Sequence, residues 1–267
     1  MEDNLRESVD YVQGHATVQP RTAVVLGSGL GHMAENVVGA VIVHYRDIPS
    51  YPVSTVEGHA GELILGNLGG EKVVIASGRF HLYEGLDIDT VTLPMRLVKA
   101  LGVENVIITN SAGSVCKENA PGSLMAVTGH LDCTFRESPE MPSIVSDSRY
   151  HSGELLEIAR KSASVEEIDL CEGEYAWTLG PSYETPAEIE MISELGGDAV
   201  GMSSVPEIRA AAELGMNVLT ISCLTNYAVD VVQTPITHED VIIIASEAGE
   251  RFGRLLSTIL EQIGESE

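Results

Sequence analysis

The segment AVVLGSGLG, residues 23–31, joins an apolar run to a glycine-rich turn. The apolar run predicts a buried strand over residues 23–26, and the residues after the glycines predict a short helical stretch. Exposed backbone N–H groups at such a turn, together with the hydroxyl of Ser28, can hold a phosphate. The segment therefore indicates an α/β protein, with the turn interpreted either as an anion site or as a purely structural connection.

The same glycines also match part of a dinucleotide-binding fingerprint. That fingerprint, G-x-G-x-x-G, would need its third glycine at the position of His32. Asp47 does lie about twenty residues further on, as the fingerprint requires. A nicotinamide site is therefore the weaker of the two ligand interpretations.

The alternation of apolar runs and helical periods continues along the chain and is typical of an α/β domain. Strands are predicted over residues 23–26, 41–44, 63–67, 72–77, 105–109, 124–128, 174–179, 199–202 and 217–223. Helices are predicted over residues 6–15, 89–101, 152–162, 186–195, 206–214 and 238–263, with N-caps at Thr185, Ser204 and Thr237. Residues 131–150 are expected to form a long loop, because they contain prolines and serines without a clear period. No Gly/Ser-rich or charged linker divides the chain, so we expect a single domain over residues 1–267.

The composition restricts the partners. The chain has 40 acidic and 15 basic residues, which give a formal net charge of −25. A surface this negative repels nucleic acid and anionic lipid, so neither nucleic acid nor a membrane is an expected partner. The four cysteines have no C-x-x-C spacing, and we expect reduced thiols in a cytoplasmic protein. The histidine and cysteine spacings of a metal site are lacking as well, so no metal is expected.

One loop places a histidine between glycines. EGHAG, residues 57–61, gives His59 little to pack against, and its imidazole can donate to an anion or bind a metal. The alternative interpretation is an exposed loop histidine.

A denser group follows the apolar run of residues 72–76. SGRFHLYEG, residues 77–85, begins at the strand end where α/β sheets bind ligands. Arg79 offers a planar fork that suits phosphate, and Glu84 can fix the orientation of His81. The alternative is a surface cluster of salt bridges.

Four later segments also follow predicted strands. TNSAGS (residues 109–114) has small residues whose amides can bind an anion, although its asparagine could simply cap a turn. The other three segments are residues 179–186, 200–207 and 222–227. The first supplies Tyr183 and Glu184, the second Met202 and Ser203, and the third Thr225 and Asn226. Together these groups suit a flat heterocycle, with the tyrosine against the ring and Glu184 and Asn226 on its polar edge. Taken singly, each segment is typical of an ordinary strand-to-helix turn.

Seven of these segments, in this order, resemble the trimeric type of purine nucleoside phosphorylase. The matching motifs are LGSGLG (26–31), GHAG (58–61), GRFHLYEG (78–85), TNSAGS (109–114), GPSYETPAE (180–188), GMSSVPE (201–207) and LTNYA (224–228). The resemblance implies a single α/β domain with a mixed, twisted, barrel-like sheet flanked by helices, and assembly as a homotrimer. It also implies a pentosyltransferase of purine salvage, which converts a purine (deoxy)ribonucleoside and phosphate reversibly into free base and pentose 1-phosphate. Phosphate would be a co-substrate, and no cofactor would be needed.

The resemblance also implies roles for individual residues. The phosphate would be held by Ser28, His59, Arg79, His81, the backbone N–H of Ser111, and Ser203. The sugar would contact Tyr83, Met202 and His238. The base would be held by Tyr183, Glu184, Val200 and Asn226, with Thr225 supporting Asn226 and Tyr175 lining the pocket. Glu84 would orient His81, and Asn226 would stabilise the departing purine as an oxyanion hole does.

Some alternatives remain open at this point. Tyr183 stands where the family usually has phenylalanine. The tyrosine that follows Asn226, Tyr227, resembles the sequence of the methylthioadenosine phosphorylase branch at this position. That branch, a nucleosidase that uses water, and a non-catalytic nucleoside-binding protein are the competing hypotheses. An ionised Glu184 can only accept hydrogen bonds, so it predicts a preference for 6-oxopurines, whose N1 carries a hydrogen.

Overall fold

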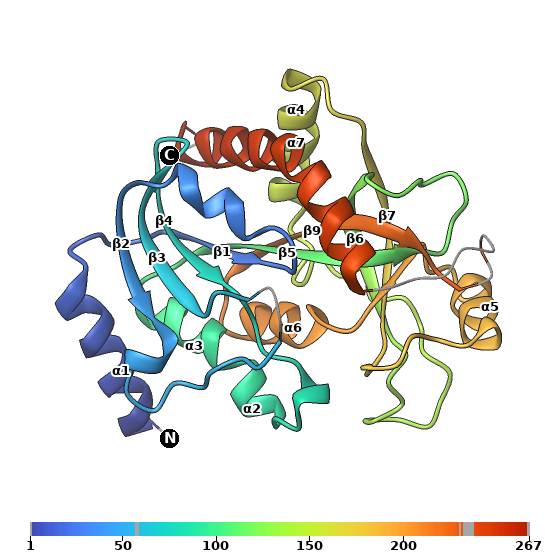
Figure 1. Cartoon of the computed structure of the whole chain (residues 1–267), viewed down its shortest axis with the longest axis horizontal. Helices are drawn as coiled ribbons and strands as arrows, with labels where there is room; N and C mark the ends of the chain where they lie inside the picture. Colours follow the sequence, from blue (N-terminus) through green and yellow to red (C-terminus); the bar gives the residue numbers. More distant parts are fainter. Residues whose placement is uncertain (1, 57–58, 230, 232–237, 266–267) are drawn as a thin grey trace.

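A mixed sheet organises the chain (Figure 1). The computed structural model describes residues 2–56, 59–229, 231 and 238–265. Within them, nine strands form one sheet in the order β2-β3-β4-β1-β5-β8-β7-β6-β9. The strands are β1 (Thr22–Leu26), β2 (Val38–His44), β3 (Glu62–Leu68), β4 (Glu71–Ser77), β5 (Asn105–Ser114), β6 (Leu124–Asp132), β7 (Leu170–Trp177), β8 (Ala199–Gly201) and β9 (Asn217–Tyr227).

Part of the sheet closes into a ring because β5 also pairs with β9. The ring runs β5-β8-β7-β6-β9, while β1, β4, β3 and β2 extend from it as an open sheet. Along one edge, β5 pairs with β1 through residues 105–108 and with β8 at Gly113 and Ser114. The two neighbours therefore diverge beside residues 109–112, which leaves room for a ligand at that edge. The expected mixed, barrel-like α/β architecture is confirmed.

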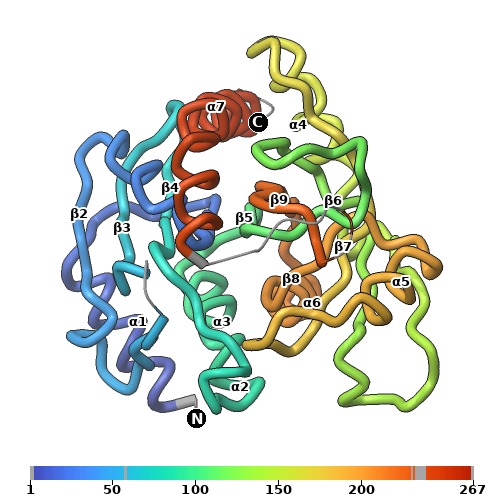
Figure 2. The backbone as a smooth tube through the Cα atoms, turned by 45° about the vertical axis from the view of Figure 1, so that its right-hand side comes forward, coloured from blue at the N-terminus to red at the C-terminus, as the bar shows by residue number. Residues whose placement is uncertain are grey.

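Helices cover both faces of the sheet (Figures 1 and 2). On one side lie α1 (Glu2–His15), α2 (Ile88–Val91), α3 (Leu93–Ala100) and α6 (Val205–Glu213). On the other side lie α4 (Gly153–Val165) and α7 (His238–Glu265), and α5 (Pro186–Glu194) flanks the ring. Single 3-10 turns occupy η1 (Gly31–Asn36), η2 (Tyr45–Asp47) and η3 (Leu82–Glu84).

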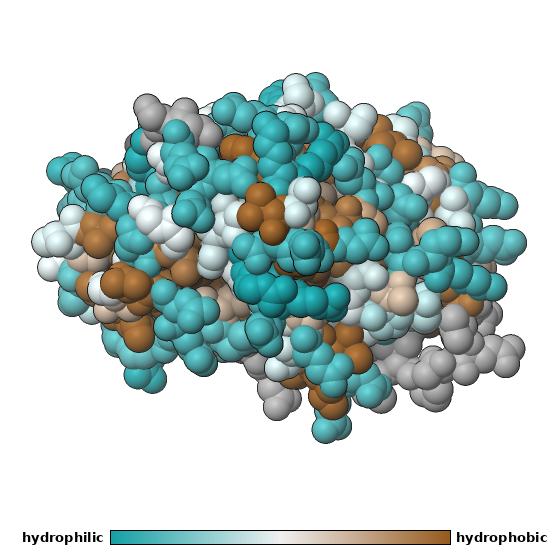
Figure 3. Space-filling view, turned by 90° about the horizontal axis from the view of Figure 1, so that it is seen from above, coloured by the Kyte–Doolittle hydropathy of each residue, from teal (hydrophilic) through white to brown (hydrophobic). Residues whose placement is uncertain are grey.

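The sequence pattern of β1 explains this layering. All five of its residues are buried, and successive side chains point to opposite faces. Ala23 and Val25 pack into the core beneath α1, α3 and α6, whereas Val24 and Leu26 pack into the core beneath α4 and α7. The outer side of α7 and α4 is mostly hydrophilic (Figure 3), as expected for amphipathic helices.

All nine strands expected from the sequence are present, but several extend further than expected. β5 continues to Ser114 and β9 to Tyr227, so their polar motif residues lie within strands rather than after them. β6 continues to Asp132, which shortens the loop expected over residues 131–150. β7 instead begins earlier, at Leu170, and ends at Trp177.

One of the expected helices is divided, and one of the expected caps forms no side-chain hydrogen bond. The single helix expected over residues 89–101 is split into α2 and α3 at Thr92, because Pro94 has no N–H for a helical hydrogen bond. Thr185 caps α5 as expected, since its hydroxyl accepts from the Glu188 N–H. Ser204 precedes α6 but makes no capping hydrogen bond, and Thr237 lies outside the described residues. Among the described helices, none is both long and apolar enough to span a bilayer.

Candidate active site

One pocket is lined by residues at the ends of β1, β4, β5, β8 and β9 and by the segment that follows β7. Thirteen of the residues expected from the sequence line it: Ser28, His59, Arg79, His81, Tyr83, Ser111, Tyr183, Glu184, Val200, Met202, Ser203, Thr225 and Asn226. The divergence of β1 and β8 along the edge of β5 places Asn110, Ser111 and Ala112 in the same wall. Residues that are far apart in the sequence thus form one continuous surface.

The glycine-rich turn after β1 is tied to β5. The Thr109 hydroxyl donates to the Val25 carbonyl over 2.9 Å and accepts from the Gly27 N–H over 3.2 Å. The Ser111 hydroxyl donates to the Ser28 carbonyl over 2.9 Å. These bonds hold Ser28 and Ser111 side by side, as an anion site requires.

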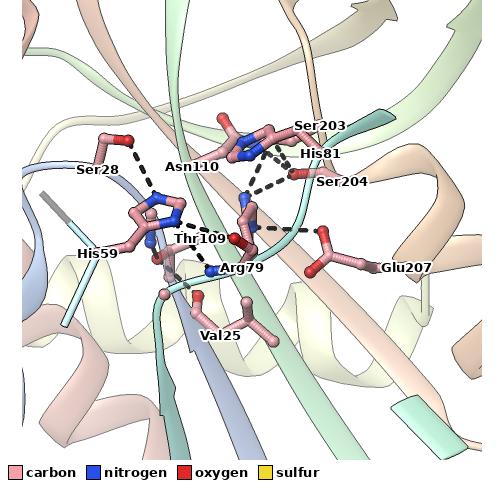
Figure 4. A network of polar contacts seen from close by, with 12 residues as sticks. Val25, Ser28, His59, Arg79, His81, Thr109, Asn110, Ser203, Ser204 and Glu207 are labelled. Atoms are coloured by element: carbon pink, nitrogen blue, oxygen red, sulfur yellow. Dashed lines mark hydrogen bonds and ion pairs between the residues drawn. The ribbon is translucent and has the colours of Figure 1, made fainter. Parts of the chain in front are cut away.

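His59 faces Ser28 across this part of the pocket (Figure 4). Its Nε2 lies 3.3 Å from the Ser28 Oγ, and its Nδ1 lies 3.2 Å from the Arg79 backbone nitrogen. Burial, with the neighbouring His81 and Arg79, lowers the pKa of His59 to about 4. The ring is therefore neutral at pH 7. The Nδ1 also lies 3.0 Å from the Arg79 carbonyl oxygen, to which it can donate, and in that tautomer Nε2 accepts from the Ser28 hydroxyl.

The Arg79 side chain is held inside the wall (Figure 4). It is only 2% exposed, and its Nη1 donates to the hydroxyls of Ser203 and Ser204 over 3.1 and 3.2 Å. Its Nε lies 3.4 Å from the Oε2 of Glu207, which is 2% exposed as well. Arg79 is therefore not a free fork that faces the cavity, as its sequence position suggests. Arg79 still lines the pocket: its Nη1 orients the Ser203 hydroxyl, and its buried Nη2 has no hydrogen-bond partner among the described residues.

A strained turn supports this arrangement. Ser204 has φ 71° and ψ −45°, and the Val205 N–H donates to the Ser203 carbonyl over 2.9 Å. These values describe a γ-turn, a conformation that costs about 1–3 kcal/mol at a non-glycine residue. The Ser204 hydroxyl accepts from the amide of Asn110 over 2.9 Å and from Arg79, and these buried bonds hold the turn.

His81 has a carboxylate behind it. Glu84 Oε1 lies 3.3 Å from the His81 Nδ1 and accepts from the His81 backbone N–H over 2.8 Å. Burial alone would raise the pKa of Glu84, but hydrogen bonds from His81 and Thr55 lower it to about 2. An ionised Glu84 favours the tautomer with hydrogen on Nδ1 and directs the Nε2 of His81 away from the carboxylate.

Tyr83 and Met202 line the same pocket as this histidine. The Tyr83 ring stacks on His81, with 4.6 Å between the ring centroids, and burial raises the pKa of Tyr83 to about 12. Both side chains lie close to Gly180, because a Cβ there would collide with the Met202 sulfur and lie 3.1 Å from the Tyr83 ring. Because its pKa is raised, the Tyr83 phenol stays protonated at neutral pH and can donate a hydrogen bond.

A second polar group lies in the same pocket. The Asn226 Oδ1 accepts from the Thr225 hydroxyl over 3.0 Å, and its Nδ2 donates to the Tyr227 carbonyl over 3.0 Å. The Thr178 hydroxyl donates to the Glu184 Oε1 over 2.6 Å, which leaves the other carboxylate oxygen for a ligand. Tyr183 lies beside them and is 42% exposed.

Comparisons with known proteins place the chain in a family. A family model described as the Phosphorylase superfamily matches residues 21–261. Purine nucleoside phosphorylase 1 of Geobacillus stearothermophilus is 40% identical, over 98% of each chain, and the Mus musculus purine nucleoside phosphorylase is 34% identical, over 98% of this chain and 95% of that protein. The structure of Schistosoma mansoni purine nucleoside phosphorylase in complex with inosine has a TM-score of 0.87 and 30% identity, and the match covers 97% of this chain and 96% of that chain.

The chain belongs to the phosphorylase superfamily. Its relatives within that superfamily are purine nucleoside phosphorylases, so the family resemblance expected from the sequence is confirmed. The enzyme class, a pentosyltransferase of purine salvage, is confirmed with it.

Three expected residues need separate comment within this phosphorylase fold. Tyr175 does not line the pocket: it is fully buried behind Ser203 and donates its hydroxyl to the Ser203 carbonyl over 3.2 Å. Its aromatic side chain belongs to the core, so the expectation that it lines the pocket is wrong. Glu84 likewise stands behind His81 rather than in the cavity wall. His238 begins α7, but its side chain lies outside the described part of the chain.

Sequence reasoning missed four polar residues that the phosphorylase pocket depends on. Asn110 and Glu207 lie inside the recognised motifs TNSAGS and GMSSVPE, and Ser204 was assigned to a helix cap. Thr178 was placed in a strand, yet it holds Glu184. The sequence indicates these residues only by their position within or next to the motifs, because the residues that they contact come from distant segments.

Proposed function

We propose that the pocket catalyses the reversible phosphorolysis of purine ribo- and deoxyribonucleosides. One observation carries the proposal: two separate hydrogen-bonded groups share a single cavity. Ser28 and Ser203 supply neutral hydroxyl donors that suit phosphate, with His59 beside Ser28, while Asn226 and Glu184 supply a carboxamide and a carboxylate that suit the edge of a purine. A phosphate and a nucleoside must meet in one cavity for this reaction.

In the proposed reaction, a phosphate oxygen forms a bond to C1′ of the sugar as the bond from C1′ to the purine N9 breaks. The electron pair of the broken bond goes to the purine, and the sugar passes through an oxocarbenium-like state, as in glycoside hydrolysis. The phosphate stabilises that cation, and the free N–H of Asn226 donates to N7 or O6 of the departing base. A donor of this kind contributes about 3 kcal/mol, by analogy with oxyanion-hole deletions.

The residues divide into three proposed subsites. Phosphate contacts Ser28, His59, Arg79, His81, Ser203 and the Ser111 N–H, and Arg79 also orients the Ser203 hydroxyl. Tyr83, Met202 and His238 contact the sugar. Tyr183, Val200, Glu184 and Asn226 hold the base, and Thr225 fixes Asn226. Tyr175 acts only by supporting Ser203.

A preference for 6-oxopurines follows from Glu184. The carboxylate can accept from the N1–H of hypoxanthine or guanine, whereas adenine presents a lone pair at N1. Structures of the Schistosoma mansoni enzyme exist in complex with inosine and with adenosine, so binding alone does not separate the two classes in that protein. Turnover is therefore the quantity to compare.

The deciding experiment is inosine cleavage with and without phosphate, followed by release of hypoxanthine. A phosphorylase stops when phosphate is omitted. Cleavage that continues without phosphate would indicate a nucleosidase, and cleavage in neither condition would indicate a binding protein. Faster turnover of methylthioadenosine than of inosine would favour the methylthioadenosine phosphorylase branch.

We also propose that residues 1–267 form one catalytic domain that assembles as a homotrimer in the cytoplasm. The loop after β6 exposes Phe135, Met141 and Ile144, which a neighbouring subunit could cover. The four cysteines form no disulfide, in keeping with a reducing compartment.

If the loop of one subunit completes the site of the next, activity should fall when dilution dissociates the assembly. Light scattering and activity measured together test this, and a fully active monomer would contradict the shared site.

A further inference from the structure

A buried ion pair lies directly behind the proposed phosphate subsite. Glu207, in the first turn of α6, places its Oε2 3.4 Å from the Nε of Arg79 (Figure 4), and each side chain is only 2% exposed. Glu207 does not line the pocket itself. Its charge therefore acts on a bound anion from behind, through Arg79.

The local charge balance is unusual for an anion site. Arg79 is the one permanent cation in the described pocket wall, and two carboxylates, Glu84 and Glu207, stand directly behind wall residues. His59 adds no charge at pH 7 because burial keeps it neutral. A third carboxylate, that of Glu184, lines the pocket itself, and no lysine and no second arginine lies among the described wall residues. Neutral donors must therefore supply most of the binding of phosphate.

We propose that Glu207 sets the affinity of the phosphate subsite by acting as the buried counter-ion of Arg79. The inference rests on the proposed phosphorylase function. A buried charge is stable only when it is paired, so the empty site needs Glu207 to neutralise Arg79. Once phosphate binds, the same carboxylate repels it across a poorly screened interior. Glu207 thus stabilises the empty enzyme and weakens its hold on phosphate.

The arrangement has a use in a reversible reaction. Phosphate and the product pentose 1-phosphate carry the same anionic group, so they occupy the same subsite. Very tight binding of that group would slow the release of product and would limit turnover. The carboxylate of Glu207 inside the wall weakens the binding of that group, and so speeds the release of product, without removing any donor from the cavity.

The substitution Glu207→Gln separates charge from shape. The glutamine side chain has nearly the same shape as the carboxylate that lies 3.4 Å from the Arg79 Nε, and the hydroxyls of Ser203 and Ser204 still hold Nη1. The geometry should therefore persist, while the positive charge of Arg79 loses its partner. We expect the KM for phosphate to fall about tenfold, the effect of one partly screened charge, and the KM for inosine to stay within about twofold. Phosphate should also raise the Tm of the variant more than that of the wild type.

The experiment measures phosphate-dependent inosine cleavage and Tm in phosphate and in chloride of equal ionic strength. Glu207→Asp keeps the charge and should retain the wild-type KM for phosphate. Glu213→Gln makes the same chemical change at an exposed position of α6 and should alter neither quantity.

The outcomes are separable. If the wild-type enzyme shows no phosphate dependence, the proposed function fails. If it does, an unchanged or raised KM for phosphate in Glu207→Gln overturns the inference alone. A Glu207→Gln protein that unfolds in chloride but folds in phosphate supports the inference, and one that stays unfolded at saturating phosphate overturns it.

Discussion

The hydroxyl of Thr225 donates to Oδ1 of Asn226 over 3.0 Å, which fixes the direction of the amide. The Nδ2 of Asn226 uses one hydrogen on the Tyr227 carbonyl, also over 3.0 Å, and keeps the second for a ligand. An amide turned by half a rotation would present its carbonyl oxygen to the lone pair of purine N7 instead. The orientation of this single side chain thus decides whether the pocket can stabilise a departing purine anion.

Replacing Thr225 by valine should test that role. Thr225→Val removes the donor but keeps the shape, so part of the population should hold the amide in the wrong orientation. We expect kcat/KM for inosine to fall about tenfold, with little change in the KM for phosphate. Thr225→Ser keeps the hydroxyl and should retain most of the activity. Equal activity of the valine and wild-type enzymes would contradict the assignment.

Base preference depends on Glu184 and Asn226 together. The Thr178 hydroxyl occupies Oε1 of Glu184, so the other oxygen is left to accept from the N1–H of a 6-oxopurine. An unpaired buried polar group costs about 1–3 kcal/mol, and more when it is charged, so inosine and guanosine should exceed adenosine about 100-fold in kcat/KM. Asn226→Asp should reduce that ratio, because a carboxyl group can accept from the 6-amino group. Wild-type turnover of adenosine equal to that of inosine would show that this reading of Glu184 is wrong.

Much of the pocket could be predicted because each motif follows an apolar strand. The strands β1, β4 and β5 are parallel and run toward a common edge, which is where the motifs that contain Ser28, Arg79 and Ser111 lie. The strands themselves were recognisable because β1, β4 and β5 are buried on both faces and appear as continuous apolar runs.

The remaining features depend on contacts between distant segments. The pairing of β5 with β9 closes the ring, yet neither strand carries a sequence signal for that partner. Glu207 resembles an ordinary acidic residue in a first helical turn, and only its burial against Arg79 shows another role. The burial of Tyr175 in the core depends on tertiary packing too, because a sequence motif does not show which aromatic residues reach a cavity.

Arg79→Ala should affect phosphate more than nucleoside. The substitution removes the donor that orients Ser203, so the KM for phosphate should rise at least about tenfold while that for inosine changes less. It also leaves the carboxylate of Glu207 buried without its partner, which should cost about 3–5 kcal/mol of stability. The double variant Arg79→Met with Glu207→Gln should recover much of that stability but not the phosphate KM. Equal effects of Arg79→Ala on both substrates would contradict the phosphate assignment.

A substitution at Gly180 can test the proposed sugar subsite. It has φ +70°, and a Cβ there would displace Met202 and press on the Tyr83 ring. Gly180→Ala should therefore lower kcat/KM for inosine about tenfold, since small displacements at a reacting centre are costly. Gly215 has φ +73° but open space around it, so Gly215→Ala isolates the cost of backbone strain, about 1 kcal/mol. If both variants lose activity equally, the sugar subsite is not responsible.

The last prediction concerns acid stability and two histidines outside the pocket. The Nδ1 of His130 and the Nε2 of His151 lie 3.0 Å apart, and both side chains are buried. Burial, together with the nearby His151 and Arg209, lowers the pKa of His130 to about 3, and burial lowers that of His151 to about 4. Unfolded histidine has a pKa near 6.5, so the unfolded chain binds more protons than the folded one as the pH falls from about 6.5 towards 4.

The stability that these neutral histidines provide is therefore complete above pH 6.5 and is lost progressively below it. Between pH 7 and pH 5, His130 alone should account for about 2 kcal/mol, or about 5 °C in Tm. The variant His130→Asn should have a lower Tm at pH 7 but a shallower decline on acidification. His15→Asn, at an exposed position of α1, should decline as steeply as the wild type. Thermal unfolding of the three proteins across this range provides the measurement, and an unchanged slope in His130→Asn would show that this buried pair does not govern acid stability.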